Sequence, residues 1–184
     1  LLNGILSSIS QSAVAFFGVY YKLQTFIYMP TSGIVQGMRP LMSYNYGAKL
    51  KERMHQILKV SGLVIAAILG AGTLLFFIVP NVLLSLFNAS SGMLEIGETG
   101  LRILSLSFIV SSFGVLMSGV FEALGLGKYS LIVSLLRQLL ITVPLAYILL
   151  NIMGIEGIWL SFVIAEAIAS IVAYILYHKK FKTI

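Results

Sequence analysis

The chain contains no cysteine and no aspartate, and these two absences exclude several kinds of site. Without cysteine there is neither a disulfide nor a thiolate-bound metal. Without aspartate there is no Ser-His-Asp set, and the two histidines, His55 and His178, both lie in basic segments between apolar runs. Glycine motifs that bind phosphates or dinucleotides are also missing. We therefore expect a protein that is not an enzyme, with no catalytic residue, no resident cofactor and no metal site.

Charged residues are scarce as well. They make up 10% of the chain, whereas hydrophobic residues make up 59% and the mean hydropathy is +1.01. A soluble domain usually carries about 25% charged residues, so this composition indicates a lipid-exposed surface. The net charge of +6 raises the question of nucleic acid, but the lysines and arginines form short clusters between apolar runs. That distribution is typical of membrane topology signals, so we expect a lipid bilayer as partner and no nucleic acid.

Five apolar segments predict five membrane crossings, at about 13–43, 60–87, 101–125, 129–150 and 155–177. At a rise of about 1.5 Å per residue, each can cross a hydrocarbon core of about 30 Å. None alternates with a period of two, which argues against strands. Leu1 to about Ser8 resembles the tail of a truncated helix, because the chain starts inside an apolar run. The expected fold is all-α: one transmembrane helix bundle over 1–184, with five full spans and a truncated helix.

The connections between these segments predict the orientation. Loop 44–59 holds four basic residues, the turn near 125–129 holds Lys128, and the C-terminal tail is basic. Loop 88–100 and turn 151–156 contain glutamate but no lysine or arginine. Basic connections face the cytoplasm, so we expect a multi-pass protein of the cytoplasmic (inner) membrane with a cytoplasmic C-terminus. Pro30 and Pro40 predict a tilt, a kink or an interfacial extension in the long first segment.

Charged residues inside the spans are the first candidates for a site, because one charge near the bilayer centre costs about 2.5–3.5 kcal/mol on insertion scales. Arg137 lies deep in its span beside Gln138, and Glu166, near the middle of the last span, is its best candidate partner. Two alternatives stay open for Glu166: a structural pair with Arg137, or a proton or cation relay. Arg102 is excluded, since Glu98 lies four residues before it and a surface ion pair explains it.

Two stripes of residues on helical faces add further candidates. Lys22 shares one face with Gly33 and Gln36, which indicates either a cavity wall or helix packing through Gly33-x-x-x-Gly37. Arg39 is near enough to the end of its segment to snorkel toward water. A second stripe of small and polar residues ends in Glu122, and it favours either close helix packing or the border of a water-filled path. Its members are Ser107, Ser111, Gly114, Ser118, Glu122 and Gly125. The candidate cavity residues are Lys22, Gln36, Ser111, Ser118, Arg137 and Gln138, and the candidate proton or cation relays are Glu122 and Glu166.

Several strings in the sequence resemble the MATE (multidrug and toxin extrusion) family of transporters. The most specific is Gln36-Gly-Met-Arg-Pro40 followed by Tyr44-Asn-Tyr-Gly-Ala-Lys49. Further agreement comes from Phe121-Glu-Ala-Leu-Gly-Leu-Gly-Lys128, Arg137-Gln-Leu with Pro144, Gly154-Ile-Glu-Gly-Ile-Trp159 and Ala165-Glu166. The family has twelve helices in two six-helix lobes. The resemblance therefore implies an N-terminally truncated C-terminal lobe, from the end of helix seven through helix twelve.

The resemblance also implies a function. Members export drugs, other organic cations and amphipathic compounds in exchange for Na⁺ or H⁺, by alternating access of two lobes, so without the missing N-terminal lobe this chain should not transport alone. Some members carry an acidic cation ligand in helix ten, but the matching stretch 111–118 has no carboxylate. Coupling would then rest on an acid in the first lobe. The alternatives are a flippase for lipid-linked oligosaccharides or polysaccharides, which the cations Lys22, Arg39 and Arg137 keep open, and a non-transporting membrane scaffold subunit.

Overall fold

The computed structural model describes residues 2–7 and 9–181, and every regular element in this part of the chain is a helix. The all-α prediction is therefore confirmed. The elements are α1 (Leu2–Ser7), α2 (Gln11–Gly47), α3 (Lys51–Ile78), α4 (Pro80–Ser85), α5 (Ser91–Ala123), α6 (Gly127–Leu135), the π-helix η1 (Leu136–Leu140), α7 (Thr142–Met153) and α8 (Ile155–Phe181).

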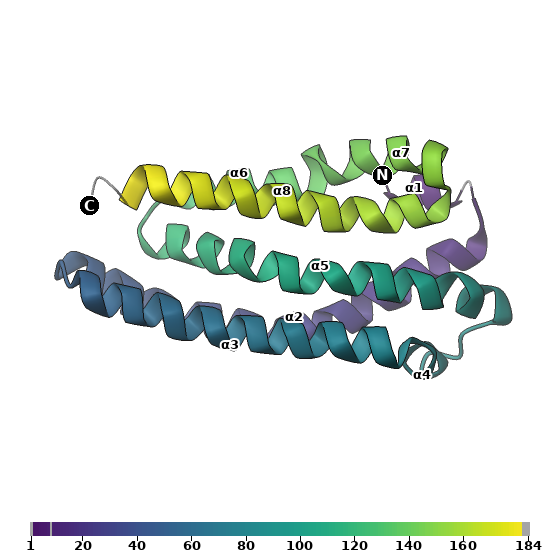
Figure 1. The fold of residues 1–184 in the computed structure, drawn as a ribbon, viewed down its shortest axis with the longest axis horizontal. Helices are drawn as coiled ribbons and strands as arrows, with labels where there is room; N and C mark the ends of the chain where they lie inside the picture. The colour runs from purple at the N-terminus through teal and green to yellow at the C-terminus, as the bar shows by residue number, and fades with distance from the viewer. Residues whose placement is uncertain (1, 8, 182–184) are drawn as a thin grey trace.

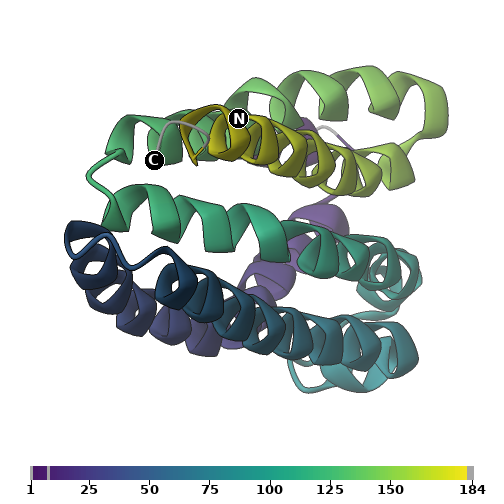
Figure 2. The ribbon, with the colours of Figure 1, turned by 60° about the vertical axis from the view of Figure 1, so that its left-hand side comes forward.

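Helix α5 occupies the middle of the bundle. It packs against α8 on one side and against α2 and α3 on the other, so the helices form a layered bundle (Figures 1 and 2). Helix α2 crosses obliquely, from α1 and the start of α8 toward the first residues of α3 (Figure 1). The α2–α3 corner, the α5–α6 corner and the C-terminal end of α8 lie at the same end of the molecule.

Four stretches of the described chain are long and apolar enough to cross a membrane: α3, α5, the α6–η1–α7 run and α8. The fifth expected segment corresponds to α2, which has 37 residues and a length of about 55 Å. Helix α2 is long enough to span but less apolar, because it carries Lys22 together with many hydroxyl and amide side chains. The chain is thus a multi-pass membrane protein.

The helix boundaries differ from the expected ones at four points. Residues 88–100 were expected to form a loop, but α5 already begins at Ser91. Residues 44–59 were expected to form a loop, but α2 continues to Gly47 and α3 begins at Lys51. A helix can extend beyond its apolar segment because its polar end lies outside the lipid. Segment 60–87 is divided, since α3 ends at Ile78 and Pro80 takes the first position of α4, where its missing N–H costs nothing. Segment 129–150 is interrupted by η1. Helix α2, in contrast, continues through both of its prolines.

Glycines bring the helices close together, at one position that the sequence suggested and at others that it did not. A Cβ atom on Gly114, a member of the stripe on α5, would lie 3.2 Å from Ser170 Oγ of α8. A Cβ atom on Gly119 of α5 would lie 2.5 Å from Val35 Cγ1 of α2, and one on Gly100 would lie 2.6 Å from Phe16 Cζ. A Cβ atom on Gly33 or Gly37 would meet nothing within 4 Å in the described chain. The close approach of α2 and α5 therefore uses glycines of α5. Neither glycine of Gly33-x-x-x-Gly37 marks such an approach to another helix within the described residues.

Candidate functional site

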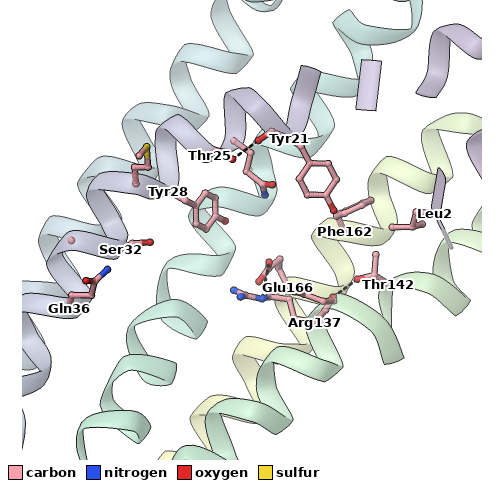
Figure 3. Close-up of a pocket in the computed structure, with 14 residues that line it drawn as sticks. Leu2, Tyr21, Thr25, Tyr28, Ser32, Gln36, Arg137, Thr142, Phe162 and Glu166 are labelled. Carbon is pink, nitrogen blue, oxygen red and sulfur yellow. Dashed lines mark hydrogen bonds and ion pairs between the residues drawn. The ribbon is translucent and has the colours of Figure 1, made fainter. Parts of the chain in front are cut away.

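A pocket of about 600 Å³ lies between α2 on one side and η1, α7 and α8 on the other (Figure 3). This volume falls within the range of about 300–1,000 Å³ that is usual for small-molecule sites. The described residues that line it are Leu2, Tyr21, Gln24, Thr25, Tyr28, Met29, Ser32, Gly33, Gln36, Arg137, Gln138, Thr142, Phe162 and Glu166.

The α2 wall of the pocket is one helical face. Tyr21, Thr25, Tyr28, Ser32 and Gln36 recur every three or four residues, which aligns their side chains along the helix. The hydroxyl of Thr25 donates to the backbone carbonyl of Tyr21 at 2.8 Å, so it is already occupied. Figure 3 shows the ring of Tyr28 projecting from α2 toward Glu166.

The opposite wall includes the π-helix η1, from which Arg137 and Gln138 both line the pocket. The hydroxyl of Thr142, the first residue of α7, donates to the backbone carbonyl of Arg137. Single π-helical turns are frequent at functional sites. No sequence pattern that we considered predicts this one.

Arg137 and Glu166 form an ion pair across the pocket wall. The distance from Arg137 Nε to Glu166 Oε1 is 3.6 Å, and the two side chains are 20% and 14% exposed. The predicted pairing of these two residues is therefore confirmed. Glu166 Oε2 is buried and has no hydrogen-bond partner in the described structure. Among the described lining residues these two carry the only charges.

The other predicted cavity residues lie outside the pocket lining. Lys22 is exposed, and its Nζ lies 6.0 Å from the centre of the Phe87 ring, on a different side of α2 from Tyr21 and Tyr28. Ser111 is buried behind the pocket, where its hydroxyl shares a 2.5 Å hydrogen bond with the Tyr28 hydroxyl. Ser118 is half-buried on α5 and does not line the pocket. The structure therefore brings together Gln36, Arg137, Gln138 and Glu166.

Glu122 belongs to a second cluster, at the α5–α6 corner. Its carboxylate forms an ion pair with Arg39 of α2, and it accepts a 2.7 Å hydrogen bond from Ser130 of α6. Arg39, which was expected to reach toward water, is 41% exposed and also pairs with Glu122. The hydroxyl of Ser43 donates to the carbonyl of Ala123 at the same corner. These contacts tie the C-terminal half of α2 to the turn between α5 and α6.

Several lining residues escaped prediction because they are uncharged. Tyr21, Gln24, Tyr28, Ser32 and Phe162 are ordinary residues in a membrane helix when each is considered alone. A search for polar and aromatic residues at helical spacing beside the Lys22 stripe would have found the α2 members. Within the described residues there is no group of three histidine or acidic side chains that could hold a metal ion.

Comparisons with known proteins extend over nearly the whole chain. The MatE family model matches residues 1–148. The chain is 26% identical over 176 residues to a "Multidrug export protein MepA" of Staphylococcus saprophyticus, which covers 96% of this chain and 39% of that protein. A MepA protein of Staphylococcus aureus strain N315 matches with the same identity and coverage. The chain thus spans about two fifths of the length of these relatives.

Solved structures show the same fold. An outward-facing multidrug resistance MATE transporter of the MOP superfamily superposes with a TM-score of 0.91 at 22% identity, covering 99% of this chain and 42% of its own. A MOP superfamily transporter from Pyrococcus furiosus superposes with a TM-score of 0.86 at 21% identity, and the match covers 94% of this chain and 39% of that protein. These relatives are named as exporters and transporters, which agrees with the expectation of a protein that is not an enzyme. The chain belongs to the MatE family.

Proposed function

We propose that this chain is the C-terminal lobe of a transporter that exports drugs and other organic cations in exchange for Na⁺ or H⁺. The observation that carries the proposal is a pocket of about 600 Å³ that holds a mostly buried ion pair, inside a bundle in which four helical stretches are apolar enough to span a membrane. The staphylococcal relatives are named multidrug export proteins, which supports the same substrate class. Alternating access requires a second lobe, so the intact transporter comprises both.

Within this lobe, Gln36, Arg137 and Gln138 contact the transported molecule from the two walls of the pocket. Glu166 is the better of the two relay candidates, because its carboxylate borders the pocket and keeps one oxygen without a partner. Glu122 is already bound by Arg39 and Ser130, which favours a structural role at the α5–α6 corner.

The proposed location is the cytoplasmic membrane, with the C-terminus inside the cell. The α2–α3 corner, the α5–α6 corner and the end of α8 share one end of the molecule (Figure 1). Lys49, Lys51, Arg53 and Lys128 are exposed there. This clustering of cations at one end supports a cytoplasmic orientation for it by the positive-inside rule.

The test uses the intact protein, expressed in cells that lack their own efflux pumps, with ethidium efflux as the measurement. We expect Glu166→Gln to abolish efflux at an unchanged amount of protein in the membrane, because it removes the charge that faces the pocket. Glu98→Gln is the matched control, since Glu98 forms an exposed ion pair with Arg102 outside the pocket and should keep efflux. Absence of efflux from the wild-type protein, or normal efflux from Glu166→Gln, would count against the proposal.

A flippase for lipid-linked sugars is the second candidate. Arg137 inside the pocket favours it, because a pyrophosphate group needs a cation. The Pyrococcus furiosus relative is described as having a binding pocket of reversed polarity that suggests a different function. The ion pair with Glu166 weakens this alternative for the present chain, since it neutralises the arginine.

A further inference from the structure

We propose that Arg137 keeps this pocket electrically neutral, and that the pocket therefore binds the uncharged, hydrogen-bonding part of the transported molecule and not its cationic group. The inference rests on the proposed transport function, and it assigns to Arg137 a role in setting which ligand charge this lobe accepts.

The charges around the pocket carry the first step. Arg137 and Glu166 are the only charged residues among the described ones that line it, and they pair with each other at 3.6 Å. A ligand cation that approaches Glu166 meets the guanidinium at a similar distance, so attraction and repulsion largely cancel. The other charges carried by α2 lie outside the lining, since Arg39 pairs with Glu122 and Lys22 lies beside Phe87.

The uncharged lining residues carry the second step. Gln24, Gln36 and Gln138 each offer two N–H donors and a carbonyl acceptor, on both walls of the pocket. The rings of Tyr21 and Phe162 provide flat apolar surface between them (Figure 3). Amides beside aromatic rings suit a neutral aromatic compound with hydroxyl or amide groups. Such a ligand leaves the ion pair intact, whereas a cation that displaced Arg137 from Glu166 would separate it, which is costly when both side chains are mostly buried.

Two probes separate the neutral from the cationic mode of binding. Chloramphenicol is uncharged and combines an aromatic ring with hydroxyl and amide groups, whereas tetraphenylphosphonium is a permanent aromatic cation without hydrogen-bond donors. Their dissociation constants are measured by equilibrium dialysis on the purified intact protein, without an ion gradient. In Arg137→Met the pocket keeps Glu166 and loses its compensating charge, so tetraphenylphosphonium should bind about tenfold tighter or more. The affinity for chloramphenicol should change by less than about threefold, since its amide partners remain.

The matched control is Arg102→Met, which also removes the arginine of an Arg–Glu ion pair, but this pair is exposed on α5 and lies outside the pocket. It should leave both affinities unchanged. The double variant Arg137→Met/Glu166→Gln is neutral again, and the affinity for tetraphenylphosphonium should return to the wild-type value. If Arg137→Met alone does not fold, Glu166→Gln makes the same test in the other direction: the pocket becomes positive and the cation should bind about tenfold more weakly or not at all.

Two results would overturn the inference. One is an unchanged or weaker affinity of Arg137→Met for tetraphenylphosphonium, and the other is a wild-type protein that does not bind the neutral probe. These results are separable from the proposed function, because binding is measured without transport. If Arg137→Met alters the affinities as expected but the wild-type protein shows no efflux, only the proposed export function is refuted. If the wild-type protein exports but Arg137→Met leaves the affinities unchanged, only the role of Arg137 is refuted.

Discussion

Replacing Gly157 with alanine tests the tightest backbone contact between two helices of the structure. Helix α7 ends at Met153 and α8 begins at Ile155, so Gly154, with a φ of 68°, is the whole connection between them. Immediately after this turn, a Cβ atom on Gly157 would lie 2.3 Å from the carbonyl oxygen of Leu149. The obstacle is backbone, which cannot rotate aside as a flexible side chain would.

The magnitude follows from two opposing effects. An ordinary Cβ contact lies at 3.4–4 Å, so the two helices must separate by more than 1 Å at this point. Overpacking of a closely packed interior costs about 1–3 kcal/mol, and an immovable backbone atom places this case at the upper end. Replacing glycine with alanine in a helix stabilises the helix by about 1 kcal/mol. We therefore expect Gly157→Ala to lower the free energy of unfolding by about 2 kcal/mol.

The assay is thermal unfolding of the detergent-solubilised intact protein, followed by intrinsic fluorescence. Trp159 is fully buried two residues from the substitution and is the only tryptophan of the chain. For a folding unit of 150–250 residues, about 2 kcal/mol corresponds to a fall in Tm of about 4–8 °C. Gly70→Ala is the matched control, because its Cβ atom would lie at an acceptable 3.4 Å from Ile109 Cδ1 and Tm should not fall. An unchanged Tm for Gly157→Ala, or an equal loss in the control, would refute the reasoning.

Three further predictions concern the corner cluster, the orientation and the π-helix. Glu122→Gln breaks the ion pair with Arg39, but these side chains are 37% and 41% exposed, so thermal unfolding should report a loss of at most about 1 kcal/mol. In an intact protein freed of any other cysteines, Lys49→Cys should react with a membrane-impermeant maleimide only from the cytoplasmic side and Ser90→Cys only from outside; the reverse pattern would overturn the orientation. Thr142→Val removes the donor to a carbonyl of η1 and should cost about 1 kcal/mol in the same assay, whereas Thr142→Ser keeps the hydroxyl and should cost less.

Composition and hydropathy were sufficient to predict the fold class, because lipid contact imposes apolar segments of a minimum length whatever their exact sequence. The ion pair was also predictable: two opposite charges deep in neighbouring spans have few alternatives to pairing. The break between α3 and α4 was missed, although Pro80 marks it, because the apolar run continues across it. The π-helix was missed for a different reason. In the structure Thr142 donates to a carbonyl of η1 and α8 packs against it, and neither contact follows from a periodic pattern in the sequence.

The pocket itself was predicted only in part, because its wall consists mainly of residues that are individually unremarkable. Lys22 was predicted to line the cavity because of its charge, but the face of α2 that lines the pocket is the neighbouring face, which carries Tyr21 and Tyr28. The most distinctive string, from Tyr44 to Lys49, ends α2 at the corner and lies outside the pocket lining. Sequence resemblance thus identified the family through a helix end, and the structure was needed to find the pocket wall.

Helix α2 is the long helix that is least suited to lipid, and it forms one whole wall of the pocket. The two facts have one physical cause. Hydroxyl and amide side chains are unfavourable against lipid tails, so a spanning helix can carry a face of them only where that face borders water, ligand or protein. The opposite wall carries charge as well, and there Arg137 and Glu166 neutralise each other. A polar cavity can therefore persist in this bundle without a net charge inside the membrane, and a substitution that removes one member of the pair should alter which ligands bind before it alters the fold.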